Sequence, residues 1–174
     1  MKVTPLKIPD VKLIEPEVFT DERGFFYESF NQKQFNDAVG QEVIFVQDNQ
    51  SKSKKGVLRG LHYQEQPLTQ GKLVRVIFGE VFDVAVDIRK NSATYGQWVA
   101  EILSSNNKKQ LWIPPGFAHG FLTMTDDTEF FYKTTDFYSK EHERCIHWKN
   151  NDFNINWPQL NTSIVTSLKD SLYT

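Results

Sequence analysis

The stretch Lys72–Ile88, KLVRVIFGEVFDVAVDI, decides the fold. It contains the apolar runs Lys72–Phe78 and Val81–Ile88, separated by Gly79-Glu80. Each run has the length and composition of a buried strand, and a short Gly-containing break between such runs is typical of a hairpin turn. The second run is almost continuously apolar although it includes aspartates, which indicates a central strand. The stretch therefore predicts two adjacent β-strands joined by a tight turn.

Short apolar or alternating runs continue on both sides of this stretch, separated by turn residues. Their spacing favours a β-sandwich or barrel over alternating βαβ units. One helix is expected at Gln32–Val39, with Asn31 as its N-cap and Gly40 at its end, and the polar stretch Asn161–Thr174 is expected to be a mobile tail unless something docks it. The fold class is therefore all-β with one or a few short helices. Strands are predicted at Gly24–Phe30, Val43–Asn49, Val57–Tyr63, Lys72–Phe78, Val81–Ile88, Trp98–Leu103, Gln110–Ile113, His119–Thr123 and Glu129–Thr134.

Length and composition narrow the class of protein. The 174 residues fit a single domain, residues 1–174, which is large enough to bury a core without staples. A net charge of -2, with Lys and Arg spread along the chain, does not predict nucleic-acid binding. No run approaches the roughly 18 apolar residues of a membrane helix, and the first residues lack a signal-peptide apolar region. The lone Cys145 is read as a small semi-buried apolar residue and fits a reducing, cytoplasmic compartment.

Three segments carry residues suited to proton transfer. The first, Arg59–Lys72, brings a guanidinium, the imidazole of His62 and an ammonium onto strand, turn and strand. Such groups can bind an anion, remove a proton and stabilise the oxyanion that forms. The segments Pro114–Phe121 and Phe131–Thr135 follow downstream. Together they indicate proton-transfer chemistry inside a β-barrel.

Alternation along the strands predicts which of these side chains share a face. Gln47 and Asn49 are two residues apart and therefore face the same side. Arg59 and His62 have opposite parity, so a regular strand would send them to opposite faces. If both line one pocket, the strand must be irregular between them, and Gly60 is the natural place for a bulge or kink.

The following motifs occur in this order along the chain: Asp21-Glu22-Arg23-Gly24-Phe25-Phe26, Phe45-Val46-Gln47-Asp48-Asn49, Gly56-Val57-Leu58-Arg59-Gly60-Leu61-His62-Tyr63-Gln64, Gln70-Gly71-Lys72, Gly79–Arg89, Leu111-Trp112-Ile113-Pro114 and Asn156-Trp157-Pro158. On these motifs the chain resembles the dTDP-4-dehydrorhamnose 3,5-epimerase family nearly from end to end. The resemblance implies a jelly-roll (cupin) barrel, a homodimer, and a dTDP-linked deoxyhexose substrate with a ketone at C4. It also implies epimerisation at C3 and C5 through enolate intermediates, in dTDP-L-rhamnose biosynthesis.

The same resemblance assigns roles to individual residues. His62 is the expected base, and Asp170 holds its tautomer and stabilises the imidazolium. Lys72 is expected to stabilise the oxyanion at C4, and Tyr132 to deliver a proton from the opposite face. The substrate-binding residues implied are Arg23, Glu28, Gln47, Asn49, Arg59, Lys72, His119, Tyr138, Glu143 and Lys169.

Several alternatives stay open at this stage. Tyr138 is the alternative proton donor, or a residue that stacks on the nucleotide base, and Asp170 is the weakest catalytic assignment because it lies in a polar tail. Glu28 and Glu143 could simply neutralise nearby cations, and His119 could cap backbone carbonyls. For the whole protein, the alternatives are an epimerase acting at one carbon only and a non-catalytic sugar-nucleotide-binding cupin.

A metal site of the cupin type is not expected. Metal-binding cupins carry two His one residue apart and a Glu in the first motif, whereas here His62 is followed by Tyr63 and Gln64. Only the run from Pro114 to His119 resembles the second cupin motif. Two separated His without an evident third ligand make a poor transition-metal site, so no metal or other cofactor is predicted.

Overall fold

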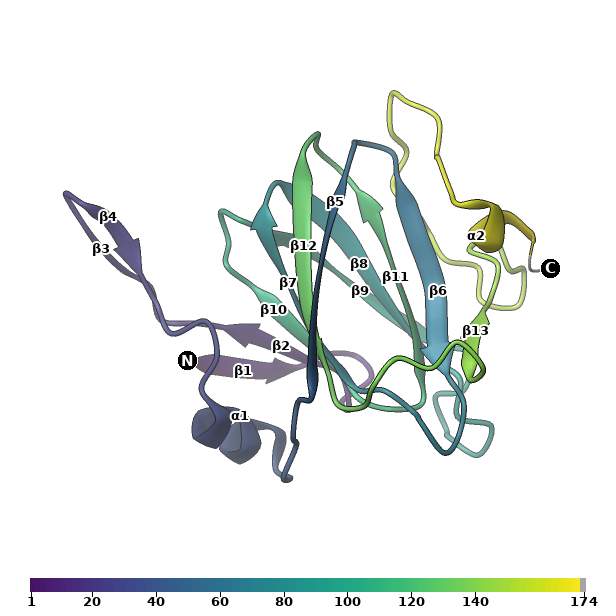
Figure 1. Cartoon of the computed structure of the whole chain (residues 1–174), viewed down its shortest axis with the longest axis horizontal. Helices are drawn as coiled ribbons and strands as arrows, with labels where there is room; N and C mark the ends of the chain where they lie inside the picture. Colours follow the sequence, from purple (N-terminus) through teal and green to yellow (C-terminus); the bar gives the residue numbers. More distant parts are fainter. Residues whose placement is uncertain (173–174) are drawn as a thin grey trace.

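Largely apolar strands build two antiparallel sheets that pack face to face in this computed structural model, which describes residues 1–172 (Figure 1). The strand orders are β1-β2-β10-β7-β12-β5 in the six-stranded sheet and β13-β6-β11-β8-β9 in the five-stranded sheet, while β3 and β4 form a separate hairpin. The elements are β1 Lys2–Pro5, β2 Lys12–Glu15, β3 Phe19–Asp21, β4 Gly24–Phe26, α1 Gln32–Val39, β5 Gln47–Ser53, β6 Leu58–Gln64, β7 Lys72–Phe78, β8 Glu80–Asp87, β9 Trp98–Ser104, β10 Gln110–Ile113, β11 Phe117–Thr123, β12 Thr128–Thr134, β13 Glu143–Cys145 and α2 Leu168–Leu172.

Three apolar clusters hold these layers together. The largest lies between the two sheets and includes Val74, Phe121 and Phe130. A second packs α1, through Phe35, against Trp112 on the outer face of the six-stranded sheet. The third covers the outer face of the five-stranded sheet with the segment that follows β13. Both sheets are therefore covered on two faces over part of their area, which explains their nearly continuous apolar runs.

Much of the predicted secondary structure is confirmed. The helix α1 has the predicted bounds; the Asn31 side chain accepts a hydrogen bond from the backbone of Gln34, and Gly40 ends the helix in the left-handed conformation. Strands β7 and β10 also have their predicted bounds, and β6, β8, β9, β11 and β12 differ by at most two residues at an end. The predicted bulge is confirmed as well.

The bulge lies in β6, where it pairs with β11. Phe121 pairs with Arg59 and His119 pairs with His62, so β6 has one more residue than β11 between these pairs. Gly60 has φ of +134°, and a Cβ there would lie 2.5 Å from the Cα of Gly120. Only glycine fits this close approach, and the extra residue turns Arg59 and His62 to the same face.

The hairpin predicted at Gly79 is wrong. Strand β7 belongs to the six-stranded sheet and β8 to the five-stranded sheet, so the chain crosses from one layer of the sandwich to the other at Gly79. The partners of β7 are β10 and β12. Composition predicted both strands correctly, but their buried, apolar character is shared by every interior strand and does not specify pairing partners.

Two other predicted strands are only partly correct. The run Val43–Asn49 is mostly irregular, because Val43 and Phe45 pack against α1 and Trp112 instead of entering a sheet. Only the end of that run belongs to β5, and only the first three residues of Gly24–Phe30 form β4. Apolar residues that cover the outside of a sheet therefore resemble a strand in the sequence.

The C-terminal segment is docked over the part that the structure describes. Val165 forms a parallel bridge with Val57, and α2 contacts β6. Of the tail predicted at Asn161–Thr174, residues 173–174 lie outside the described residues. The elements β1, β2, β3, β13 and α2 were not predicted. Within residues 1–172, no helix is long and apolar enough to cross a membrane.

Candidate active site

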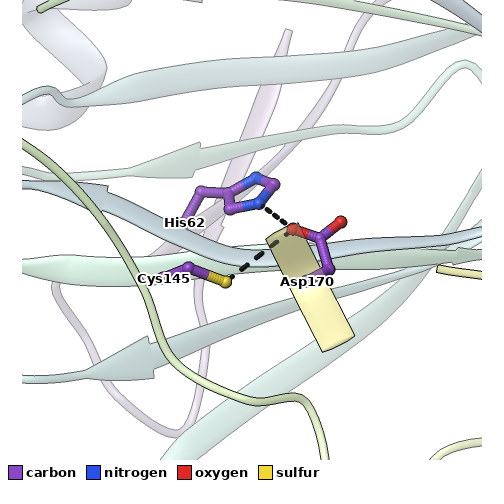
Figure 2. Close-up of side chains that lie close together, drawn as sticks. All are labelled: His62, Cys145 and Asp170. Carbon is purple, nitrogen blue, oxygen red and sulfur yellow. Dashed lines mark hydrogen bonds and ion pairs between the residues drawn. The ribbon is translucent and has the colours of Figure 1, made fainter. Parts of the chain in front are cut away.

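The bulge in β6 and the docking of α2 bring His62 and Asp170 together. His62 Nε2 lies 2.6 Å from Asp170 Oδ1, although the two residues are 108 positions apart in the chain (Figure 2). Asp170 is 3% exposed, and the His62 side chain is 29% exposed. The backbone N–H of Asp170 donates to Ser167 Oγ at 3.1 Å, which fixes the turn that carries the carboxylate.

The environment of Asp170 keeps its carboxyl group ionised. Burial alone would raise the pKa of Asp170, but the hydrogen bond and charge of His62, together with bonds from Ser167 and the Gly60 backbone, hold it below its usual value. An ionised carboxylate only accepts hydrogen bonds, so Nε2 of His62 is the donor, and in the neutral imidazole the free lone pair is on Nδ1. The pair thus forms an oriented base.

A second buried group of charges lies beside this pair. The ammonium of Lys72, a residue that is 8% exposed, donates to the backbone carbonyl of His62 at 3.4 Å. Burial lowers the pKa of Lys72 to about 8, although the charges of Asp83 and Glu143 oppose the shift. Lys72 is therefore mostly protonated at neutral pH and can stabilise an oxyanion.

His119 is held by a carboxylate that the sequence analysis did not assign to the site. Its Nε2 lies 2.9 Å from Oδ2 of Asp83, a residue with no exposed surface. Burial lowers the pKa of His119, partly offset by Asp83, so its imidazole is neutral at neutral pH. Burial likewise raises the pKa of Asp83, against the charges of His119 and Lys72. The signal for Asp83 was present, because a carboxylate inside an apolar strand needs a buried partner.

Tyr132 points into the interior of the sandwich from β12. It packs against the central cluster, with its ring centroid 6.1 Å from that of Phe130. Burial raises the pKa of Tyr132, although the charge of Arg59 opposes the shift, so the phenol keeps its proton at neutral pH. Arg59 itself donates from Nε to Ser53 Oγ at 3.1 Å.

Further polar residues form a connected rim at the surface. The Tyr138 hydroxyl donates to Glu143 Oε2 at 2.8 Å, and the same carboxylate pairs with Lys169 of α2. The Tyr138 backbone N–H donates to Gln47 Oε1 at 3.0 Å, and Gln47 Nε2 donates to Asn49 Oδ1 at 2.8 Å. The prediction that Gln47 and Asn49 share a face is thereby confirmed. These contacts join β5, β13 and α2 into one polar surface.

Two predicted binding residues lie elsewhere in this chain. Arg23 is in the turn of the β3–β4 hairpin and pairs with Asp21, while Glu28 follows β4 and accepts from Asn31 and Gln34. The hairpin lies at the opposite end of the molecule from β13 and α2 (Figure 1). The structure therefore brings together the other predicted site residues and leaves these two apart.

The side chains of His62, Cys145 and Asp170 could in principle hold a metal ion, since their ligand atoms lie within 4.8 Å of one another (Figure 2). The 2.6 Å between His62 Nε2 and Asp170 Oδ1 is shorter than the roughly 3.3 Å that separates two ligands of tetrahedral zinc. Burial and the charge of Asp170 raise the pKa of the Cys145 thiol to about 12, so it is protonated. This geometry fits a hydrogen-bonded chain and not a metal centre.

Fold and site together define a cupin-type jelly roll whose interior carries titratable groups suited to proton transfer. The model of the dTDP-4-dehydrorhamnose 3,5-epimerase family matches residues 5–174, and the chain belongs to this family. The family resemblance expected from the motifs is thus confirmed.

Individual relatives agree with this assignment. The chain is 64% identical over 161 residues to dTDP-4-dehydrorhamnose 3,5-epimerase of Shigella flexneri, covering 92% of this chain and 89% of the relative. A crystal structure of the Legionella pneumophila epimerase in complex with dTDP-4-keto-L-rhamnose is 54% identical, with a TM-score of 0.94 over 98% of this chain and 89% of that one. A 3′-monoepimerase from Streptomyces bikiniensis, in complex with dTDP-quinovose, is 30% identical with a TM-score of 0.90 over 96% and 84% of the two chains.

Proposed function

We propose that this protein is a dTDP-4-dehydrorhamnose 3,5-epimerase that converts dTDP-4-dehydro-6-deoxy-D-glucose to dTDP-4-dehydro-L-rhamnose. The observation that carries the proposal is the His62–Asp170 pair beside the buried Lys72, in a chain of this family. The Legionella pneumophila relative, which binds dTDP-4-keto-L-rhamnose, supports the same substrate class.

His62 is the base that abstracts the proton. Hydrogens at C3 and C5 lie next to the C4 ketone, so each can leave as a proton if the resulting enolate is stabilised. The Nδ1 lone pair of His62 takes the proton, and Asp170 stabilises the imidazolium that forms. No change of oxidation state occurs in this step, so the reaction requires no electron carrier.

Lys72 and Tyr132 complete the reaction. The Lys72 ammonium stabilises the negative charge that develops on the C4 oxygen, in a buried position where such an interaction is strong. Tyr132 then returns a proton to the opposite face of the carbon, which inverts the configuration. Tyr138 is the weaker candidate for this donor, because its hydroxyl proton is already engaged by Glu143.

The polar rim suits the nucleotide part of the substrate. Arg59 and Lys169 supply cations for charge-assisted hydrogen bonds to the diphosphate. The exposed ring of Tyr138 offers a surface on which the thymine base can stack. Gln47 and Asn49 of the rim, and His119 of the interior, contribute neutral hydrogen-bonding groups.

A homodimer would bring Arg23 and Glu28 to a site. The β3–β4 hairpin exposes Phe19, Phe25 and Phe26, which are 57%, 59% and 68% exposed. A two-stranded hairpin is marginal on its own, and an exposed apolar patch of this kind marks an interaction surface. We therefore propose that the hairpin of one protomer packs on a second copy and supplies Arg23 and Glu28 to the partner's site. A single domain, residues 1–174, and a cytoplasmic location stay predictions.

Incubation with dTDP-4-dehydro-6-deoxy-D-glucose in D2O, followed by NMR of the sugar, tests the proposed reaction. We expect deuterium at both C3 and C5 together with the L-configured product. Label at one carbon only would identify a mono-epimerase, as in the Streptomyces bikiniensis relative. Bound substrate without any label would instead identify a non-catalytic sugar-nucleotide-binding protein. His62→Asn serves as the control that removes the base while leaving the rim intact.

A further inference from the structure

Strand β13 places Cys145 directly opposite His62. The two residues are paired across the antiparallel ladder between β13 and β6. Directly opposed residues of such a pair extend to the same face of the sheet, so the thiol and the imidazole lie next to each other. Both side chains point toward Asp170 of α2, as Figure 2 shows.

The thiol and the imidazole share one acceptor. Cys145 Sγ lies 3.7 Å from Asp170 Oδ1, the same oxygen that lies 2.6 Å from His62 Nε2. The carbonyl of Ile146 is also 3.7 Å from Sγ, but it already accepts the backbone N–H of Leu61 at 3.0 Å. An ionised carboxylate is the stronger acceptor of the two.

Burial supports the thiol as a hydrogen-bond donor. Cys145 is 8% exposed, and burial together with the charge of Asp170 raises the pKa of its thiol to about 12. The sulfur therefore keeps its proton at neutral pH and can donate a hydrogen bond to the carboxylate, whereas a nucleophilic role would need the thiolate. The sequence reading of Cys145 as an apolar filler leaves out this contact.

We propose that Cys145 is a positioning residue for the base, whose S–H group hydrogen-bonds Asp170 Oδ1 and holds the carboxylate in line with His62. The inference rests on the proposed role of His62. Without the thiol, Asp170 loses a donor on the oxygen that faces the imidazole. More negative charge then remains on Oδ1, the imidazolium is better stabilised, and His62 becomes neutral only at higher pH.

Other charges surround the pair and must stay unchanged in a test. Glu143 of β13 and Lys169 of α2 form an ion pair beside Cys145, while Lys72 of β7 and His119 of β11 approach His62 from the barrel interior. A change confined to Cys145 leaves all four in place. It also leaves Ser167 and the Gly60 backbone as donors to Asp170.

Replacement by valine and by serine separates donation from packing. Cys145→Val keeps an apolar side chain of similar size without a donor, and Cys145→Ser keeps a donor. In the valine variant we expect the NMR titration midpoint of the His62 imidazole, and the acid limb of kcat/KM, to move up by about half a pH unit. On the acid side of this limb, that change corresponds to a roughly threefold loss of kcat/KM relative to the parent. The serine variant should resemble the parent in both measurements.

Two outcomes would overturn the proposal. A valine variant with the parent's titration and pH profile would mean that the thiol only fills space. Equal loss of kcat/KM in the valine and serine variants would mean that the side-chain volume at this position, and not hydrogen-bond donation, determines activity. Cys145→Ala provides a smaller donor-free variant if valine prevents folding, which thermal unfolding of each protein reports. The NMR titration needs no turnover, so an inactive parent would refute the proposed function without deciding the role of Cys145.

Discussion

At the scale of single residues, the buried aspartates of β8 illustrate two uses of one residue type. Asp83 and Asp87 both have no exposed surface. Asp87 accepts hydrogen bonds from Arg89, Ser92 and Thr94, which more than offset the effect of burial and lower its pKa. Asp83 instead contacts His119 and helps to keep Lys72 protonated. The first carboxylate organises a loop, and the second belongs to the site.

This contrast predicts different outcomes for two matched variants. Lys72 is needed as an ammonium and has a pKa of about 8, so activity should be present below pH 8 and fall as pH rises through that value. Asp83→Asn removes a charge that raises this pKa, so the alkaline limb of kcat/KM should move to lower pH. Asp87→Asn should leave the limb in place while lowering the free energy of unfolding by about 3 kcal/mol. pH–rate profiles and urea unfolding measure both effects, and an unmoved limb in Asp83→Asn would contradict the role of Asp83.

The two tyrosines make a second residue-scale prediction. Tyr132 is half-buried with its phenol protonated, whereas Tyr138 is 55% exposed and bonded to Glu143. Tyr132→Phe should lower kcat by about a hundredfold or more, the usual range for a lost general acid. Exchange of the substrate's C3 and C5 hydrogens with D2O should continue in this variant, because the base is still present. Tyr138→Phe should chiefly change KM. Steady-state kinetics with deuterium exchange decide this, and a larger kcat loss in Tyr138→Phe would reverse the assignment.

At the scale of elements, the bulge of β6 is what allows one strand to present both Arg59 and His62 on the same face. It depends on the close approach of Gly60 and Gly120, where a Cβ on Gly60 would lie 2.5 Å from the Gly120 Cα. Strand β13 then adds Cys145, and α2 adds Asp170, to the same edge of β6. Strand β13 and helix α2 therefore both contact this irregular strand.

Glycine variants test whether the bulge depends on this contact. Gly60 and Gly40 both have positive φ, but a Cβ at Gly40 would meet nothing within 4 Å. Gly40→Ala should therefore lower the free energy of unfolding by about 1 kcal/mol, through backbone strain alone. Gly60→Ala should lower it by roughly 3 kcal/mol or more, because overpacking adds to the strain. Chemical denaturation compares the two, and equal losses would contradict the steric argument.

At the scale of the whole molecule, the β3–β4 hairpin, whose turn contains Arg23, lies at the opposite end from β13 and α2 (Figure 1), and Glu28 follows this hairpin in the chain. The phenylalanines of the hairpin are exposed in the single chain. Sites shared between two copies would account for both observations, and such sites have a distinctive consequence for mixed dimers.

Mixing two inactive variants tests this arrangement. Arg23→Ala and His62→Asn should each have little activity, but a mixed dimer would contain one site with both native residues. Co-expression with different tags should therefore restore about half of the parent's activity per purified mixed dimer. No recovery in a verified mixed dimer would mean that each site uses residues of its own chain. A monomeric parent in sedimentation analysis would refute the dimer itself.

Local signals account for most of the predicted elements. The cap Asn31, the terminating Gly40 and the periodicity of Lys72–Phe78 act over a few neighbouring residues, so they were readable in the sequence. The need for a break at Gly60 followed from strand parity. By contrast, β1 and β13 are short strands that form because a partner strand is present, and their sequences carry little signal of their own.

The sequence alone determined the all-β class, the helix α1, and the residue types able to perform proton transfer. Those properties depend on local backbone preferences and on side-chain chemistry. Pairing between strands, the crossing at Gly79, the meeting of His62 with Cys145 and Asp170, and that of His119 with Asp83 depended on the packing of distant segments. Burial in that packing also set the pKa of Lys72, because desolvation exists only once the sheets have closed around the side chain.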